Sequence, residues 1–419
     1  MKTFTFMIFT ILLFSFAGEG SADEMISVRL RNYIGDTSKI SFRLTGDYLT
    51  LDPALKLKEG VDYTLSLKSG KMYLHCGKTK TKMNVPFVLY PYAYDEQHLI
   101  NIDGRPYMGS VEFQIEKASN IRPVNQLLLE DYLKGVVPYE VFPDWNLEAL
   151  KAQTLAARTY AITHQTSKLD DTIQYQVYGG YNQFKKTTRA VNETKGEIIT
   201  FNNKPINAFY SASNGGMTES NEHVWGGKES PYFPIKKDVH DPIQPWNFTL
   251  NKIQMQLDEI NWDDSNWWDN LREKDPQITA SMKNWLNHNG YPGEIKLLRI
   301  PHFSIDEDKN ESNRSLKGSI QLEFMRKLVD GTILFEKISL NQVELKKIRP
   351  MIGGAYFRSY LLTSFEKTPT SYKIKGNGNG HGVGMSQWGA NVMAERGKTY
   401  KDILNYYYPG TKIKVVKSE

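Results

Sequence analysis

Residues 144–165 read DWNLEALKAQTLAARTYAITHQ and predict a buried helix at the centre of the fold. Asn146 is suited to cap the N-terminus of this helix, and Glu148 lies in its first turn, where a negative charge is favourable. Small side chains cover much of the helix surface and let neighbouring backbone approach closely. They are Ala149, Ala152, Ala156, Ala157 and Ala161. We therefore expect other elements to pack around this helix.

The same helix carries two cations on one face. Lys151 and Arg158 lie seven residues apart, which separates them by two helical turns. A buried positive charge requires a compensating partner. We therefore expect anionic or hydroxyl-rich groups beside this face.

The residues just upstream contain a candidate catalytic acid. NQLLLEDYLKGVV (125–137) has a helical apolar pattern, and Pro138 is expected to end that helix. Glu140 follows, between Pro138 and Pro143 and among apolar neighbours. Apolar surroundings disfavour the ionised carboxylate, so they raise its pKa and keep it protonated for general-acid catalysis. The alternative is that Glu140 is a solvated loop residue.

The rest of the chain predicts an α+β fold in which buried central helices pack against mainly antiparallel strands. Residues 26–115 and 294–375 alternate apolar and polar positions in short runs, as strands do. We expect a β-rich N-terminal region over 23–120, followed by a domain over 121–419. A Trp-rich segment at about 245–290 is interpreted as helical with irregular connections.

Two short helices are predicted in residues 386–408. The first runs from Ser386 to Arg396. Thr399 is placed to cap the second, with Asp402 completing a capping box.

Two further segments are rich in glycine and polar residues. FYSASNGGMTESNEHVWGG (209–227) crowds hydroxyl and amide groups around two glycines, a composition suited to a polar uncharged ligand but also to a plain turn-rich loop. GNGNGHGVGMSQWGA (376–390) places glycine at alternate positions on both sides of His381. Such spacing indicates tight turns or close backbone approach, and the segment lacks both the phosphate-loop and the dinucleotide-binding pattern.

Composition and the N-terminus narrow the setting of the protein. The 419 residues carry 52 Lys and Arg against 47 Asp and Glu without basic clusters, so a nucleic-acid partner is not expected. Residues 1–22 combine Lys2, an apolar run and small residues, which is typical of a signal peptide or a short membrane anchor. We expect an exported protein, at the outer face of the cytoplasmic membrane or in the cell wall, that touches the membrane only through this segment.

The sequence lacks the motifs of metal-dependent and serine-nucleophile catalysis. The histidines form no H-E-x-x-H pair and the chain has one cysteine, so we expect neither a metal site nor a cofactor. No G-x-S-x-G motif supports a serine nucleophile.

Three long segments resemble the stage II sporulation protein D family, whose domain is also described as an amidase enhancer. They are LLLEDYLKGVVPYEVFPDWNLEALKAQTLAARTYAI (127–162), FYSASNGGMTESNEHVWGG (209–227) and GNGHGVGMSQWGANVMAERGKTYKDILNYYYPGTKI (378–413). The resemblance runs in order over most of the chain after residue 22. Phe142, Met217 and Trp388 depart from the commoner family residues.

The resemblance implies a peptidoglycan lytic transglycosylase that cleaves peptide-stripped glycan strands to 1,6-anhydro-muramic acid ends during sporulation, with a cell-wall amidase as its partner. It also implies Glu140 as the catalytic acid. Candidate substrate-binding residues on the family motifs are Lys151, Arg158, Ser213, Thr218, His381, Ser386 and Gln387.

Two alternatives remain open. A non-catalytic module that binds peptidoglycan and stimulates the amidase would not need Glu140. A hydrolytic glycosidase would need a second carboxylate, for which Glu222, Asp238 and Asp241 are available.

Overall fold

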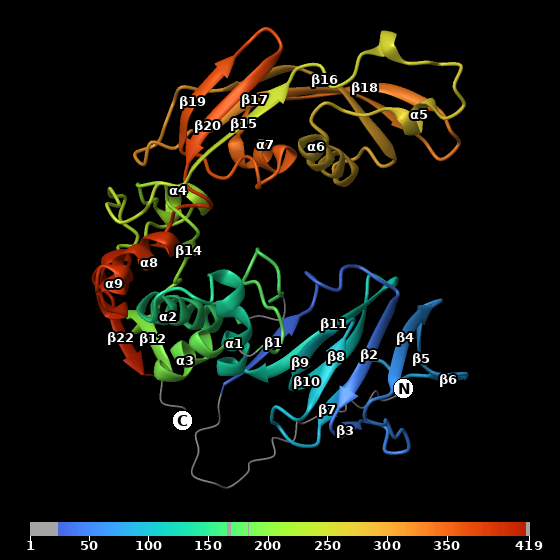
Figure 1. Cartoon of the computed structure of the whole chain (residues 1–419), viewed down its shortest axis with the longest axis vertical. Helices are drawn as coiled ribbons and strands as arrows, with labels where there is room; N and C mark the ends of the chain where they lie inside the picture. The colour runs from blue at the N-terminus through green and yellow to red at the C-terminus, as the bar shows by residue number, and fades with distance from the viewer. Residues whose placement is uncertain (1–23, 166–168, 183, 416–419) are drawn as a thin grey trace, which may run out of the picture.

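The structure, a computed structural model, describes residues 24–165, 169–182 and 184–415. The segment interpreted as a signal peptide or anchor, residues 1–22, lies outside this range. Within the range, no helix is long and apolar enough to cross a membrane. The chain forms an arc, with an N-terminal β lobe, a helical centre and a second β-rich lobe (Figure 1).

The N-terminal lobe is built from two antiparallel sheets. One has the strand order β1-β11-β10-β7-β3 and the other β6-β5-β4-β2-β8-β9. Their bounds are β1 (Met25–Arg29), β2 (Lys39–Thr45), β3 (Tyr48–Thr50), β4 (Asp62–Lys68), β5 (Lys71–Cys76), β6 (Thr79–Lys82), β7 (Phe87–Pro91), β8 (Leu99–Ile102), β9 (Arg105–Met108), β10 (Ser110–Glu116) and β11 (Asn120–Leu128). The strand-like alternation of residues 26–115 is confirmed.

One hydrophobic core joins this lobe to the first two helices. Strand β11 runs directly into α1 (Leu129–Glu140), which is followed by α2 (Leu147–Thr163). Strand residues such as Phe113 and Leu127 share a buried cluster with Leu133 of α1 and Ala157 of α2. The packing of the N-terminal lobe therefore continues past residue 120 and supports the end of α1, where Glu140 lies.

The bounds of α1 differ from the prediction at both ends. The helix begins at Leu129, because Asn125 belongs to β11, where its amide donates to the carbonyls of Met108 and Ser110. Pro138 lies inside the last turn and does not end the helix. A proline removes one backbone hydrogen bond, but Val141 N–H still bonds to the carbonyl of Val137, so the helix continues to Glu140.

Helix α2 is the buried centre that the sequence predicts. The side chain of Asn146 accepts a hydrogen bond from Glu148 N–H and caps the helix. The five alanines are all buried, and other helices and strands pack around α2. These neighbours are α3 (Lys185–Glu193), α8 (Gln387–Glu395), α9 (Tyr400–Tyr407), β12 (Glu197–Phe201) and β13 (Lys204–Pro205), and β22 (Lys412–Val415) extends the sheet of β12.

The two C-terminal helices lie where the sequence predicts them, and the predicted capping box of the second is present. The Ser386 side chain caps α8 through Gly389 N–H, and Thr399 and Asp402 form the capping box of α9.

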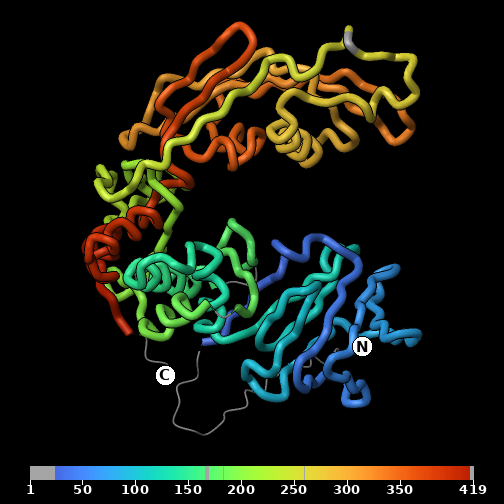
Figure 2. The backbone as a smooth tube through the Cα atoms, viewed as in Figure 1, coloured from blue at the N-terminus to red at the C-terminus, as the bar shows by residue number. Residues whose placement is uncertain are grey.

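The second β-rich lobe is inserted between the two glycine-rich segments. The chain leaves the helical centre after about residue 241 and returns near residue 378 (Figure 2). Its elements are β15 (Pro245–Asn251), η1 (Leu257–Glu259), α5 (Trp267–Asn270), α6 (Pro276–His288), β16 (Glu294–Ile305), β17 (Lys317–Lys327), β18 (Ile333–Glu344), α7 (Leu345–Ile352), β19 (Leu362–Lys367) and β20 (Ser371–Asn377). We call this unit, residues 245–377, the inserted lobe.

The Trp-rich segment is less helical than predicted. It opens with strand β15, which pairs with β20 and buries Trp246 in the core of the inserted lobe. Its alternating exposed and buried residues follow strand periodicity. The α+β class with mainly antiparallel strands is confirmed. The exception among the described pairs of strands is the parallel pair of β14 (Tyr210–Ser211) and β21 (Met385–Ser386).

Candidate active site

Glu140 is the last residue of α1, and its side chain is partly buried. Oε1 accepts a 2.7 Å hydrogen bond from the backbone N–H of Val177. Burial raises the pKa of Glu140 to about 7, although hydrogen bonds from Val177 and from the Gln387 side chain oppose that rise. The pKa of Glu140 is raised in the direction that its sequence neighbours predict, and at about 7 both the protonated and the ionised forms are populated near neutral pH.

Glu140 faces a cavity of about 750 Å³. The lining residues come from the end of α1, from α2, from the loop that follows it and from both glycine-rich segments. They are Glu140, Tyr160, His164, Ile173, Gln174, Tyr175, Val177, Phe209, Tyr210, Ser211, Ala212, Trp225, Asn379, Gly380, His381 and Gln387. Glu140 is the one carboxylate among the lining residues that the structure describes.

Backbone pairing joins the two glycine-rich segments at this cavity. Strand β14 (Tyr210–Ser211) runs parallel to β21 (Met385–Ser386). The close approach requires glycine: Gly384 has φ +73°, and a Cβ there would lie 2.1 Å from the carbonyl oxygen of Phe209. The alternating glycines therefore serve the tight turns and close contacts that the sequence predicts.

His381 enters the cavity from this glycine-rich turn. Its Nδ1 accepts a hydrogen bond from Val383 N–H at 3.0 Å, so the ring proton of the neutral form lies on Nε2. Burial, and then the charge of Arg314, lowers the pKa of His381 to about 4. The imidazole is therefore uncharged at neutral pH.

An aromatic wall completes the cavity. Trp225, at the end of α4 (Asn221–Trp225), keeps 52% of its surface exposed and lies 4.4 Å from Phe209 and 5.0 Å from His381 between ring centroids. Trp225 is not among the site residues predicted from the sequence. The one feature that could have indicated it is its position inside the second family-like segment, 209–227.

Asp241 holds the two glycine-rich segments together behind the cavity. Its carboxylate accepts hydrogen bonds from the hydroxyls of Ser213 (2.8 Å) and Ser386 (2.6 Å) and from Asn214 N–H (3.0 Å). Asp238 accepts a further bond from the Asn214 amide at 2.7 Å. Asp238 and Asp241 were two of the three acids available from the sequence as a second carboxylate. In the structure both are buried and hold neighbouring loops by hydrogen bonds.

The predicted substrate-binding residues therefore separate into two groups. His381 and Gln387 line the cavity beside Glu140. Ser213 and Ser386 are buried and turned toward Asp241, and the Thr218 hydroxyl donates to the carbonyl of Pro234 at 2.7 Å. Those three side chains hold the loops in place and do not line the cavity.

Lys151 and Arg158 also lie outside the cavity lining. Lys151 pairs with Glu148 (3.1 Å) and Glu193 (2.6 Å). Arg158 is buried and forms a two-point contact with Glu130, at 2.8 and 2.7 Å. The anionic neighbours that the sequence predicts for this helix face are thus carboxylates of the protein itself.

No group of three or more potential metal ligands occurs among the residues that the structure describes.

Comparisons with known proteins agree on one family. The family model of the Stage II sporulation protein, SpoIID, matches residues 117–201. The "Amidase enhancer" of Bacillus subtilis (strain 168) is 38% identical over 91% of this chain, which spans about half (53%) of that relative. An uncharacterized protein of Brachyspira hyodysenteriae is 32% identical, covering 77% of this chain and 76% of its own. The "Stage II sporulation protein D" of Bacillus subtilis is 28% identical over 72% of this chain and 79% of its own length. The chain thus belongs to the Stage II sporulation protein family, SpoIID.

Proposed function

We propose that this protein is an exported lytic transglycosylase of the cell wall, active in sporulation. Its substrate is a glycan strand of peptidoglycan from which a cell-wall amidase has removed the stem peptides. The product carries a 1,6-anhydro-muramic acid end. Membership of the SpoIID family and the names of two relatives support a role in the cell wall during sporulation.

The single observation that carries the proposal is a lone carboxyl group with a raised pKa among the described lining residues of the cavity. Glycosidases that hydrolyse their substrate use two carboxyl groups, one as acid and one as nucleophile or base for water. Among the described lining residues only Glu140 has a carboxyl group, and burial raises its pKa to about 7. A transglycosylase needs no second carboxylate, because the nucleophile belongs to the substrate.

The chemistry follows from one group acting twice. Glu140 donates its proton to the glycosidic oxygen between N-acetylmuramic acid and N-acetylglucosamine, and the bond from that oxygen to the anomeric carbon C1 breaks. The resulting carboxylate then takes the proton of the muramyl C6 hydroxyl, whose oxygen bonds to C1. The acid is restored and no water is consumed.

The rest of the cavity suits a neutral sugar polymer. Gln387 and Asn379 offer hydrogen bonds without charge to hydroxyl and acetamido groups, and the His381 ring beside them is uncharged. Trp225 presents a half-exposed ring against which the apolar face of a sugar can pack. Stem peptides on the strand would have to fit beside the residues that line this cavity, so we expect strands without peptides to bind better.

A second function deserves a test because one relative is named "Amidase enhancer". In that alternative the cavity binds glycan, and binding alone stimulates the amidase. The test measures release of stem peptides from cell walls by a purified amidase, with the protein or its Glu140→Gln variant added. If both stimulate equally and neither cleaves stripped strands, the chain is a binding module. If stimulation by the parent is accompanied by strand cleavage and the variant loses both, the transglycosylase is the better account.

A further inference from the structure

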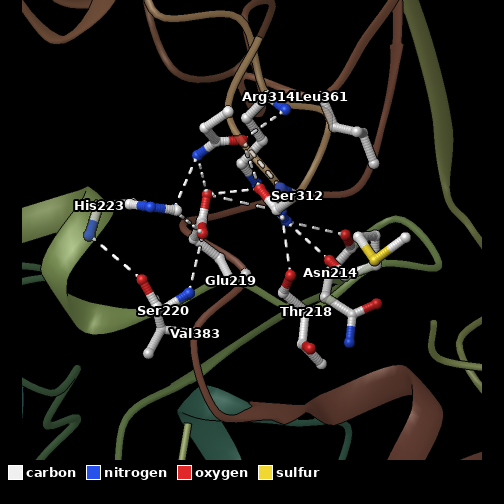
Figure 3. Close-up of polar contacts among 12 residues, drawn as sticks. Asn214, Thr218, Glu219, Ser220, His223, Ser312, Arg314, Leu361 and Val383 are labelled. Carbon is white, nitrogen blue, oxygen red and sulfur yellow. Dashed lines mark hydrogen bonds and ion pairs between the residues drawn. The ribbon is translucent and has the colours of Figure 1, made fainter. Parts of the chain in front are cut away.

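The inserted lobe sends one loop into the base of the glycine-rich turns. This loop, residues 306–316, joins β16 to β17 and carries Arg314, whose side chain is buried (Figure 3). The guanidinium donates to the backbone carbonyls of Asn214 at 3.0 Å and Met217 at 2.9 Å, and more weakly to that of Thr218 at 3.4 Å. A side chain of the inserted lobe therefore holds the turn that precedes α4.

Glu219 is the counter-charge in this joint. Its carboxylate lies 3.9 Å from Arg314 and accepts hydrogen bonds from Ser312 (2.6 Å) and Asn310 (2.7 Å) of the same loop. Burial raises the pKa of Glu219, but the Ser312 bond and the charge of Arg314 bring it below its usual value. The carboxylate is also bonded to His223 at 2.9 Å, on the helix that carries Trp225. The joint thus connects the inserted lobe to one wall of the cavity.

Arg314 also contacts the turn that carries His381. A Cβ built on Gly382 would lie 2.0 Å from Arg314 Nη2, so only glycine leaves room for the guanidinium here. The backbone N–H of Glu219 donates to the carbonyl of Gly382 at 3.0 Å, which ties the two turns to each other. Arg314 is therefore packed against Gly382, the residue that follows His381 in the chain.

The charge of Arg314 acts on the His381 ring. After burial it is the largest cause of the lowered pKa of His381, followed in the same direction by Arg349 of α7 and opposed by a hydrogen bond to the backbone of Tyr210. The other titratable groups among the described residues that line the cavity with His381 are Glu140, Tyr160, His164, Tyr175 and Tyr210. The inserted lobe thus supplies both cations that keep the imidazole from gaining a proton.

We propose that Arg314 is a positioning residue through which the inserted lobe completes the active site, by holding together the two glycine-rich turns behind the cavity. Its charge also acts on the His381 ring, which lies on one of these turns. The inference rests on the proposed function for the identity of the ligand. The packing of Arg314 against Gly382, in the turn that carries His381, does not depend on that function. The inference also gives the inserted lobe a structural role at the active site, because its loop 306–316 holds the turns that line the cavity.

The experiment compares Arg314→Gln, Arg314→Lys and the control Arg326→Lys in the full chain. Arg326 pairs with Glu336 inside the inserted lobe, and neither residue lines the cavity. Two quantities are measured. One is the titration of the His381 ring by NMR of ¹⁵N-histidine protein, assigned with His381→Gln. The other is the steady-state cleavage of stripped glycan strands between pH 5 and 8.

The expected results separate the charge of Arg314 from its geometry. Arg314→Gln raises the titration midpoint of His381 above that of the parent, toward its ordinary value, and any acidic limb of cleavage moves with that midpoint. Arg314→Lys keeps the low midpoint but loses the planar contacts, so kcat/KM falls about tenfold, mainly through KM. Arg326→Lys matches the parent in both measurements.

Two results would overturn the inference. One is an unchanged His381 midpoint in Arg314→Gln. The other needs no variant and so survives a folding failure: an ordinary midpoint of 6 to 7 for His381 in the parent protein. If the parent cleaves no glycan but Arg314→Gln still shifts the midpoint, the proposed function fails while the positioning role of Arg314 stands.

Discussion

The backbone N–H of Val177 donates a 2.7 Å hydrogen bond to the carboxylate of Glu140, which lines the cavity. A hydrogen bond to the ionised form lowers a carboxyl pKa, whereas burial raises it. The two effects, with the bond from Gln387, leave the pKa of Glu140 at about 7. The loop that contains Val177 therefore tunes this group to the pH range in which it can both give and take a proton.

The pH dependence of cleavage follows from that pKa. Only the protonated form of Glu140 can start the reaction, so kcat/KM should fall as pH rises above about 7, approaching a tenfold loss for each pH unit. Initial rates on stripped glycan strands between pH 5 and 9 measure this limb. A profile that stays level up to pH 9 would assign the acid to another group.

Stability should depend on Glu140 in the same pH window. The folded pKa of about 7 lies above the ordinary 4.5, so this group stabilises the fold fully below pH 4.5, and that contribution is lost as pH rises through 7. Glu140→Gln removes the ionisation. We expect the variant to exceed the parent in free energy of unfolding by about 3 kcal/mol at pH 8 and by much less at pH 5. Urea unfolding at both pH values measures the difference; a gain that is equal at pH 5 and pH 8 would contradict it.

Trp225 should contribute to binding more than to chemistry. Its exposed ring lines the cavity, and stacking of a sugar ring is expected to be worth about 1.4 kcal/mol, or tenfold in affinity. Trp225→Ala should therefore raise KM for stripped strands about tenfold and leave kcat within about threefold. Trp262→Ala is the matched control, because Trp262 is similarly exposed (50%) and does not line the cavity. Equal KM values for the two variants would remove Trp225 from the substrate site.

Arg158 offers a test of a residue that family resemblance assigns to the substrate. Its guanidinium is buried against Glu130, and it does not line the cavity. Arg158→Met should lower the free energy of unfolding by about 3 kcal/mol, because it leaves a carboxylate without its partner. Cleavage by the folded fraction should keep the KM of the parent. A raised KM with unchanged stability would instead support the assignment to glycan binding.

The helix that organises the fold was predictable because its signals are local. The Asn146 cap, the row of alanines on α2 and the capping box at Thr399 each depend on residues within a few positions of one another. The raised pKa of Glu140 was predictable for the same reason, since the apolar residues that suggest it are adjacent in sequence. These features survive in the structure almost unchanged.

What sequence could not supply is the direction of side chains in the glycine-rich segments. Ser213 and Ser386 lie on family-like motifs, yet both turn toward Asp241, which lies at least 28 residues away along the chain. The joint at Arg314 spans about 100 residues between its partners. Such long-range polar pairs leave no periodic pattern, so only the fold reveals them. Pro138 was misread for a different reason: a proline in the last turn costs one hydrogen bond without stopping the helix.

The central claim is that Glu140 cleaves glycan by transfer to the strand's own C6 hydroxyl. Mass spectrometry of peptide-stripped strands after incubation with the protein, with Glu140→Gln and with the control Glu222→Gln tests it most directly. Glu222 is exposed and does not line the cavity. We predict 1,6-anhydro-muramic acid ends from the parent and from Glu222→Gln, and none from Glu140→Gln. Reducing ends that carry an added water, or fragments that persist in Glu140→Gln, would contradict the account.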